Sequence, residues 1–593
     1  MHKMRPERRL WPLRLAIRYL TVALLVSLAL LNFLLWHQTQ LPFGRRHPIQ
    51  RLMAEAEARS RVLMARRSLD LATAAARYRH RRRRHPPPGF DDWFRAAAEA
   101  DAVVVEDFFD RIYKDVTPFW ALSPSSIRRR ATAWHWVVRV RNGTASPQGN
   151  VEGRVPWLQL WTSLVSEFAS KLPDVDMPIN MLDEARLLVP HADMARLVAK
   201  AESETTMTDP DLTSSRFSGL ADVDDDRPPL YEPPWFGPGN SYWNLAAKTC
   251  GPDTPAHGVR QIRDFAPPAE LPPDWRPPYA LEGFVQNWTA AMDPCLQPHL
   301  RQLHGTFIEP LSLSSTDELI PIFGGSKLPM NSEILIPGAM YLTDDTFYSG
   351  GEAHGPAWPD KKDGLIWRGD ASGGRTKEHS WHHFQRHRLV DMLNGTTVSR
   401  LESAGVRAPT FSLPSTSLYR RRRQLGAWIA RFADAAFVHL CPPGECDFVS
   451  PYFRPSDQVP METQYQHKFL PDADGNSFSA RFRGFLRSTS LPIKATIYAE
   501  WHDDRLIPWL HFVPMDNTFQ DLYALLDFFA PGGSLNNRGD AAARLIAERG
   551  RDWAETVLRR EDMRLYVWRL LLEWARVCDD ERHNLGFVDD LRS

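Results

Sequence analysis

The pattern of apolar and polar positions is most regular in residues 464–498. An apolar and basic run ending at Leu470 predicts a strand. Residues 474–476 (Asp-Gly-Asn) predict a turn, because Gly and Asn tolerate positive φ. A single apolar stripe on a helix is predicted by the i, i+4, i+7, i+8 spacing of Phe478, Phe482, Phe485 and Leu486. Residues 491–498 predict a second strand, which completes a strand–turn–helix–strand unit.

This unit could bind an anion. Its turn directs backbone N–H groups and the positive end of the helix dipole to one point. Arg481 in the first turns of the helix could add a positive charge, and Lys468 could add another from the strand side. An ordinary βαβ crossover with a solvated arginine is the favoured interpretation on local chemistry alone, and anion binding stays open as the alternative.

The N-terminal residues predict membrane attachment. Residues 19–36 carry no charge and are about long enough to cross a bilayer. Basic residues precede this segment, which predicts a cytoplasmic tail at 1–18 and an uncleaved signal anchor at 19–36. A cleaved signal peptide is the alternative, but residues 36–40 match a cleavage site poorly.

An Ala- and Arg-rich segment at residues 37–88 predicts a helical stem that ends at Pro86-Pro87-Pro88. We interpret its Arg run as a solvated face of the stem, with a nucleic-acid patch as the alternative. Residues 89–593 would then form the luminal body.

Sequons and cysteines agree with a luminal body. Asn142, Asn287 and Asn394 each begin an Asn-x-Thr sequon. The chain has five cysteines, too few for a disulfide scaffold. Two bridges are nevertheless conceivable, which would leave Cys578 as the odd thiol: Cys250 with Cys295, and Cys441 with Cys446.

Composition narrows the class of protein. Lys+Arg and Asp+Glu are each 72, which argues against a nucleic-acid-binding protein as a whole. A hydrophobic content of 43% with 21 Trp and 30 Phe indicates a folded globular body.

Two other stretches carry candidate chemistry. Residues 177–182 predict a short buried strand that ends in the carboxylate pair Asp183 and Glu184, and α/β sheets place ligands at strand ends. Residues 362–375 predict a strand that leads into a Gly-rich turn flanked by Arg368 and Arg375. Such a turn lets the backbone approach a diphosphate closely.

The neighbourhood of this Gly-rich turn raises three further points. The Asp370 carboxylate would repel a diphosphate, so we expect it to point away or to contact sugar hydroxyls. On the following helix Arg386 or Arg388 could reach the phosphates, and we prefer Arg388. His379, His383 and His387 could bind zinc, but the HExxH arrangement is absent and a solvated or core-facing role is favoured.

The acidic run 224–226 is interpreted as a surface loop, with metal binding as the less favoured alternative.

Several separated blocks resemble one known family. HKFLPDADGNSFSARFRGFLRSTSLPIK, followed by EWHDDRLIPWLHFVPM, resembles the signature of the family 90 glycosyltransferases. This family contains capsule-associated proteins of fungi and animal protein O-glucosyltransferases. The blocks at residues 86–94, 321–337 and 362–375 follow the family's order. The resemblance covers most of the chain from Pro86 to the C-terminus.

The resemblance implies an α/β fold of two Rossmann-like domains facing a cleft, called GT-B, after a transmembrane helix and stem. The two lobes of the body would meet near residues 340–360, and the C-terminal helix could pack back on the first lobe. The implied chemistry is inverting transfer of a sugar from a UDP-sugar to a hydroxyl. Asp183, the Asp after "IN-x-x", would be the base, with Glu184 as the alternative. The implied nucleotide-sugar-binding residues are Arg368, Gly369, Asp370, Ser372, Gly373, Arg375, Arg388, Lys468, Asn476, Ser477, Phe478, Ser479, Ala480 and Arg481.

The implied partners are a UDP-sugar, a glycan or glycoprotein acceptor and a membrane. No tightly bound cofactor is expected, and because cationic side chains can replace a metal we expect no divalent metal. Similarity to the fungal branch favours xylose transfer to a mannose-containing glycan, in the Golgi or ER membrane as a single-pass type II protein. Protein O-glucosylation from UDP-glucose is the nearer alternative. A catalytically inactive luminal glycan-binding protein is the alternative from another class.

Overall fold

A computed structural model describes residues 47–592 apart from short gaps at 150–155, 238–240, 270, 272–275, 312–313, 350, 405–406, 415–423, 442–444 and 532–536. The predicted transmembrane segment 19–36 lies outside the described residues. None of the helices within the described part of the chain is both long and apolar enough to cross a membrane. The chain divides into two compact units, residues 1–54 and 55–593, and every strand that the structure describes belongs to the second.

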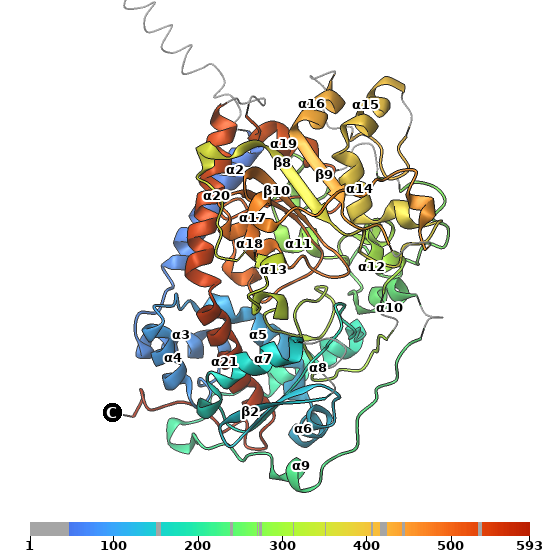
Figure 1. Ribbon diagram of the computed structural model, residues 1–593. Helices are drawn as coiled ribbons and strands as arrows, with labels where there is room; N and C mark the ends of the chain where they lie inside the picture. Colours follow the sequence, from blue (N-terminus) through green and yellow to red (C-terminus); the bar gives the residue numbers. More distant parts are fainter. Residues whose placement is uncertain are drawn as a thin grey trace, which may run out of the picture. The chain divides into compact units, whose positions relative to one another are not determined.

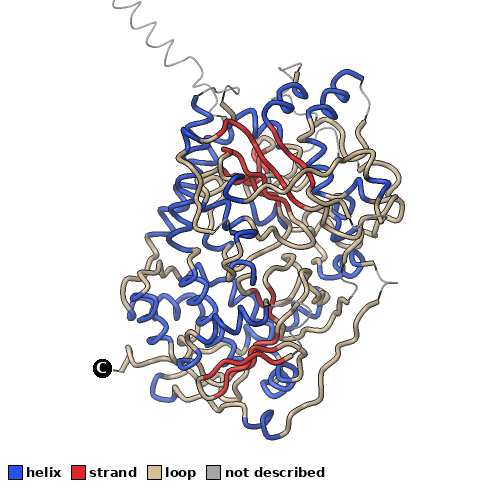
Figure 2. Tube along the Cα trace, viewed as in Figure 1, coloured by secondary structure: helices blue, strands red, loops and turns tan. Residues whose placement is uncertain are grey.

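The strands form two main sheets, which appear as two groups in Figure 2. The first sheet has the antiparallel order β2-β1-β3 and the second has the parallel order β12-β11-β10-β8-β9. Two short pairs, β4-β5 and β6-β7, complete the described strands. Their bounds are β1 Val137–Arg141, β2 Thr144–Gln148, β3 Val175–Pro178, β4 Ala280–Leu281, β5 Phe284–Val285, β6 Phe323–Gly324, β7 Ile334–Leu335, β8 Lys362–Gly369, β9 Ala433–Phe437, β10 His467–Ala473, β11 Leu491–Ala495 and β12 Val513–Pro514.

Helices surround both sheets (Figure 1). The expectation of an α/β fold is confirmed as a mixed α/β structure with a parallel sheet. The described α-helices are α2 Pro48–Met64, α3 Leu71–Arg82, α4 Phe90–Glu99, α5 Asp110–Val116, α6 Pro124–Thr132, α7 Trp157–Ser166, α8 His191–Ser203, α9 Ala221–Asp225, α10 Tyr242–Thr249, α11 Trp288–Met292, α12 Gly305–Ile308, α13 Thr346–Ser349, α14 Gln385–Met392, α15 Gly395–Ala404, α16 Leu425–Phe432, α17 Met461–Gln464, α18 Phe482–Arg487, α19 Leu522–Phe529, α20 Asn537–Val557 and α21 Arg560–Val577.

The unit predicted at 464–498 is present, with different boundaries. β10 and β11 are parallel, with Phe469 opposite Leu491, and α18 connects them. β10 continues past the predicted end at Leu470 and includes Pro471. The strand tolerates this proline because Pro471 pairs with β11 and not with β8, so β8 does not need the N–H that proline lacks. The helix begins at Phe482 and not at Phe478, because the Phe478 ring packs against Gly338 instead of along the helical stripe.

The end of the chain returns to the beginning of the body. α20 packs against α18 and β11, and α21 packs against α4, α7 and β3. Trp574 on α21 donates from Nε1 to the Asp176 carbonyl at 3.0 Å and meets Phe119 edge to face. One continuous core cluster contains residues as distant in sequence as Ala74 and Phe587.

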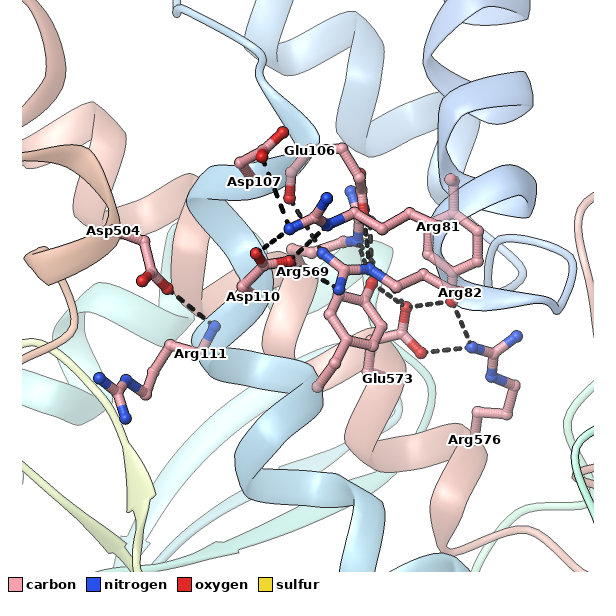
Figure 3. A network of polar contacts seen from close by, with 12 residues as sticks. Arg81, Arg82, Glu106, Asp107, Asp110, Arg111, Asp504, Arg569, Glu573 and Arg576 are labelled. Carbon is pink, nitrogen blue, oxygen red and sulfur yellow. Dashed lines mark hydrogen bonds and ion pairs between the residues drawn. The ribbon is translucent and has the colours of Figure 1, made fainter. Parts of the chain in front are cut away.

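A buried ionic cluster ties α3 to α21 (Figure 3). Arg569 on α21 is fully buried, and its Nη2 donates to both carboxylate oxygens of Glu106 at 3.0 Å. Arg82 on α3 donates to the same Glu106 at 2.8 Å. Tyr78 on α3 donates from its hydroxyl to Glu573 at 2.8 Å. Burial of these charges is tolerated because each one has a partner.

The interpretation of the Arg run as a solvated face fits only part of the run: Arg81 and Arg83 are exposed, but other members are covered by the body. Arg79 is buried, and its two terminal nitrogens donate to Asp590 at 2.7 and 2.6 Å. Arg82 is only 9% exposed and pairs with Glu106. The sequence shows the positive charges of this run but not their carboxylate partners, of which Glu106 lies 24 positions after Arg82 and Asp590 lies 511 positions after Arg79.

Candidate functional site

A cavity of about 590 Å³ lies at the carboxyl edge of the parallel sheet. The chain leaves β8 for β9 on one side and then crosses to β10 on the other side of β8. The strand order therefore reverses between β8 and β10, and such switch points hold ligands in open α/β sheets. The cavity wall contains seven of the predicted nucleotide-sugar-binding residues: Arg368, Gly369, Asp370, Phe478, Ser479, Ala480 and Arg481.

The side chain of Asp474 fixes the turn after β10 through hydrogen bonds. Asp474 is buried, and its Oδ2 accepts from the Ile497 N–H at 2.8 Å and lies 3.3 Å from His304 Nε2. Asn476 Oδ1 accepts from the Gly373 N–H at 2.9 Å, which pins this turn to the Gly-rich turn after β8. The two predicted loops therefore meet, and Ser372, Gly373, Asn476 and Ser477 lie in them.

Arg481 brings a positive charge to the cavity, and the carboxylates of Asp472 and Asp370 offset it only in part. One terminal nitrogen donates to the Arg368 carbonyl, while Nη2 is buried without a hydrogen-bond partner. Ser479 Oγ in the same wall is also buried and unpartnered. Burial lowers the pKa of Arg481. An unpaired buried donor is costly, so this wall is suited to a ligand that carries acceptor oxygens.

Arg386, from the first turn of α14, lies beside Arg481. Its guanidinium donates to the Asp370 carbonyl at 3.0 Å, to Ser372 Oγ at 2.7 Å and to the Asp474 carbonyl at 3.0 Å. Burial and the neighbouring Arg481 lower the pKa of Arg386 to about 10. Neither arginine forms an ion pair with a carboxylate in the described part of the chain, so an anion would relieve the repulsion between them.

Arg368 and Asp370 have other partners. Arg368 donates from Nη2 to both oxygens of Asp434 at 2.8 and 3.0 Å, which compensates its charge. Asp370 Oδ1 lies 2.8 Å from Nδ1 of His439, and both side chains are largely exposed. The Asp370 carboxylate is thus directed toward His439 at the rim. His439 follows a short strand of weak sequence pattern, so sequence reasoning missed it.

Three predicted residues lie away from this cavity. Lys468, near the amino end of β10, donates to Asp540 at 2.9 Å. Arg388 is buried and donates to the carbonyls of Leu303 and Asn517 at 3.1 and 2.9 Å. Arg375 donates to the Leu311 carbonyl at 2.6 Å. Arg386, and not the preferred Arg388, lines the cavity, because two residues separated by two positions on a helix point to different sides of it.

Asp183 lies at the tip of a turn after β3. Asn180 shapes this turn: its Oδ1 accepts from the Leu182 N–H at 3.2 Å and its Nδ2 donates to the Glu184 carbonyl at 2.9 Å. Asp183 is half-buried. Burial raises the pKa of Tyr348, and the charges of Asp345 and Asp183 raise it further. Since Tyr348 lines the cavity, the Asp183 carboxylate lies within electrostatic reach of its wall.

Glu184, the alternative base, points into the protein. It is buried, and its charge acts on the buried hydroxyls of Tyr242 and Tyr498. Burial is the larger cause of the raised pKa of both tyrosines. Of the two carboxylates, Asp183 is the one whose charge acts on Tyr348, a residue of the cavity wall.

Phe478 connects the cavity to the block at residues 321–337. Its ring lies against Gly338, where a Cβ atom would be 2.7 Å from Phe478 Cζ, and 5.8 Å from the Tyr341 ring. Gly325 faces Gly338 at a similarly short distance, with 3.0 Å from an added Cβ to Gly338 Cα. The glycines of this block therefore permit close packing against the loop that carries Arg481.

The predicted sequons and cysteines are placed as follows. Asn142, Asn287 and Asn394 are exposed, and the side chains of Asn287 and Asn394 accept from backbone N–H groups at the start of α11 and α15. Disulfides join Cys250 to Cys295 and Cys441 to Cys446, and Cys578 is a buried thiol.

The residues of the two metal alternatives are engaged in contacts within the protein. Asp224 accepts from Arg141, and His383 contacts the carbonyls of Gln302 and Phe265. Burial lowers the pKa of His387 to about 3. Within the described ranges no three His, Cys, Asp or Glu side chains are grouped to hold a metal ion.

The fold and the site define a mixed α/β protein with a cavity, lined in part by Arg386 and Arg481, at a switch point of its parallel sheet. Residues 429–582, which include β10, α18 and β11, match the family model described as Glycosyl transferase family 90.

Three similar proteins of known name are also described as glycosyltransferases. The chain is 34% identical over 132 residues to O-glucosyltransferase rumi of Drosophila pseudoobscura pseudoobscura, which covers 21% of this chain and 30% of that protein. It is 32% identical over 123 residues to O-glucosyltransferase rumi of Drosophila melanogaster, with 20% and 28% covered. The homolog from Anopheles gambiae is 32% identical over 128 residues, with 21% and 30% covered. The chain thus spans less than a third of the length of these relatives.

Proposed function

We propose that this protein is a glycosyltransferase that moves a sugar from a UDP-sugar to a hydroxyl of a glycan or glycoprotein. The observation that carries the proposal is the pair Arg386 and Arg481 at the switch-point cavity, together with the unpartnered Ser479 Oγ. A pyrophosphate would supply the acceptor oxygens that Arg481 Nη2 and Ser479 Oγ lack, and a negative charge beside the two guanidinium groups. The match of residues 429–582 to the family model supports the same reaction class.

The mechanism we propose is a single inverting displacement. Asp183 accepts the proton of the acceptor hydroxyl as that oxygen forms a bond to the anomeric carbon. The bond from the anomeric carbon to the β-phosphate oxygen breaks, and the electron pair leaves with UDP. Arg481 and Arg386 stabilise the charge that develops on the departing phosphate. We propose that these cations make a divalent metal unnecessary.

The donor is proposed on two grounds. The sequence resemblance to the fungal capsule-associated branch favours xylose and a mannose-containing acceptor. The relatives named O-glucosyltransferase favour glucose and a protein hydroxyl as the alternative. The two sugars differ by one hydroxymethyl group, a small difference for pocket discrimination. Turnover of UDP-xylose and UDP-glucose against a mannoside and a serine-containing folded domain, measured in parallel, decides between them.

We propose a GT-B arrangement of two α/β lobes for the body, with attachment to the Golgi or ER membrane through residues 19–36. The approach of Phe478 to Gly338 supports this arrangement, because it brings the parallel sheet against the half of the body that carries Asp183. Protease protection of the body in intact microsomes tests the orientation.

The experiment that tests the transfer reaction uses labelled UDP-sugars and the variant Asp183→Asn. Loss of turnover in the variant with retained binding of UDP supports the proposal. A chain that binds glycans but hydrolyses or transfers no UDP-sugar would instead be the inactive glycan-binding alternative. The exposed Asp370–His439 pair at the cavity rim is the observation that favours this alternative.

A further inference from the structure

A larger cavity, of about 950 Å³, lies elsewhere in the body and shares no lining residue with the switch-point cavity. Its wall comes from four segments far apart in sequence: residues 58–66, 107–114, 286–292 and 499–508, with Pro329 between them. A cavity of this volume is large enough for a ligand of several rings.

The polar part of this wall contains a guanidinium with two nitrogens that lack hydrogen-bond partners. Arg111 on α5 is 12% exposed, and its Nε and Nη1 are buried without a hydrogen-bond partner. Its Nη2 lies 3.9 Å from Asp503 Oδ2, too far for a hydrogen bond. In Figure 3 the Arg111 side chain turns away from the cluster around Arg569. Two buried donors in one cavity wall point to a ligand that supplies acceptor oxygens.

Carboxylate oxygens that can accept hydrogen bonds line the cavity close to Arg111. Asp504 lines the cavity, and its Oδ2 accepts from the Arg111 backbone N–H at 3.0 Å. The basic side chains of the wall, Arg59, Arg66, Arg111 and Lys114, are matched in number by the acidic ones, Asp107, Asp110, Asp503 and Asp504. A wall with balanced charge favours neither a polyanion nor a polycation. It fits a neutral ligand whose groups both donate and accept hydrogen bonds, as hydroxyls do.

The rest of the wall is apolar and includes an aromatic ring. Trp288 is half-buried at the start of α11, and its ring meets Phe512 edge to face at 5.5 Å between centroids. Leu63, Met292 and Ile507 line the same space. A sugar ring has an apolar C–H face that packs against an indole and a hydroxyl edge that pairs with carboxylate and guanidinium groups.

From these observations we infer that the cavity formed by α5, α11 and residues 499–508 is a binding site for a neutral oligosaccharide. Trp288 packs against a sugar ring, and Arg111 and Asp504 bind its hydroxyls. Binding at this site does not require the proposed transfer reaction, so a glycan can be held here whether or not the switch-point cavity turns over a UDP-sugar.

Binding is tested by isothermal titration calorimetry with mannopentaose and xylopentaose as probes, and with pentagalacturonate as a charged probe of equal length. The protein is used before and after enzymatic removal of N-linked glycans, because the sequon Asn287-Trp288-Thr289 forms part of the wall. We expect at least one neutral probe to bind after glycan removal, and pentagalacturonate to bind at least tenfold more weakly. Absence of binding by both neutral probes in both preparations overturns the inference.

Two variants assign the binding to this cavity. Trp288→Leu keeps apolar bulk but removes the flat ring, and Arg111→Met removes the unpartnered donors; each should weaken the neutral probe tenfold or more. The control is Tyr452→Ala, which removes an aromatic ring that is 53% exposed and lines neither cavity. The thermal midpoint and UDP affinity of each variant are measured alongside, so that a folding defect is recognised. Unchanged probe affinity in a folded Trp288→Leu protein contradicts the assignment.

Discussion

The ring of Phe478 occupies the space that a side chain at Gly338 would need, since a Cβ atom there would lie 2.7 Å from Phe478 Cζ. Gly338 has φ −57°, an angle that any residue adopts, so its requirement is one of space and not of backbone conformation. The contact positions the loop that carries Ser479 and Arg481 against the segment at residues 324–341. The geometry of the cavity therefore depends on a glycine that does not line it.

Gly338→Ala is expected to weaken UDP binding about tenfold and to destabilise the fold by about 1–3 kcal/mol, because the added methyl must displace the Phe478 ring. Binding is measured by calorimetry and stability by urea unfolding. The second-site change Phe478→Leu should restore part of the affinity. The control Gly237→Ala adds a methyl group to open space and should change neither quantity. Wild-type affinity in Gly338→Ala would show that the contact does not position the loop.

Arg481→Met should lower kcat/KM for the UDP-sugar by about 100-fold or more, because it removes a preorganised cation from the departing phosphate. The cost in stability should be small or even negative, since the wild-type guanidinium is buried with an unpartnered nitrogen. Kinetics and thermal unfolding are measured together. The matched change Arg375→Met removes an arginine that donates outside the cavity and should leave kcat/KM within a factor of two or so. Equal losses in the two variants would refute a role specific to Arg481.

Asp183→Asn should reduce kcat by about 100- to 10,000-fold while the affinity for UDP stays close to that of the wild type, because the amide cannot accept the proton of the acceptor hydroxyl. Single-turnover kinetics and UDP calorimetry measure the two effects separately. Glu184→Gln is the comparison: its carboxylate is buried and directed inward, so any loss should appear as reduced stability. Normal turnover in Asp183→Asn would assign the base elsewhere.

His502 should make stability depend on pH. Although burial lowers its pKa, the carboxylates of Glu500 and Asp503 raise it to about 9. The folded state therefore binds more protons than the unfolded state between about pH 6.5 and 9, and stability falls as pH rises through this window. His502→Gln should lose roughly 1–3 kcal/mol at pH 6 and almost nothing above pH 9. Urea unfolding at pH 6, 7.5 and 9.5 measures the difference, and a difference that does not change with pH would show that the His502 charge is not the source.

Glu106→Gln should destabilise the protein by about 3–5 kcal/mol, because it leaves Arg569 buried without its carboxylate partner. Chemical unfolding of the single variant and of the double variant Glu106→Gln with Arg569→Met gives the coupling energy, and the double variant should lose less than the sum of the single losses. Asp92→Asn, at an exposed ion pair with Arg95, should stay within about 1 kcal/mol of the wild type. Additive losses in the double variant would mean that the two side chains act independently.

Sequence reasoning located the loops of the site but not their side-chain partners. The parallel strand–helix–strand unit at 467–495 and the strand at 362–369 follow from local periodicity and turn residues, and the structure has them. The choice between Arg386 and Arg388 depended on how α14 is rotated against the sheet, which packing decides and local sequence does not. His439 and Tyr348 approach the cavity from segments without a distinctive pattern.

The start of α18 and the environment of the Arg run depend on contacts between segments that are separated in sequence, which a local pattern does not show. Phe478 fits the helical stripe by spacing, yet its ring is used in a contact with Gly338, more than a hundred positions earlier in the chain. The Arg run before residue 88 has the composition of a solvated helix, and the acids that pair with its covered members, Glu106 with Arg82 and Asp590 with Arg79, are not adjacent to it in sequence.

The tie between α3 and α21 limits where this protein can be cut. A shortened form of this protein would have to begin at or before Leu71, because α3 supplies Tyr78 to Glu573 and Arg82 to Glu106. A chain that began at residue 85 would lack these partners of both acids in an apolar interior and should be unstable. Any stable truncated form should therefore retain the Arg-rich segment as part of its folded body.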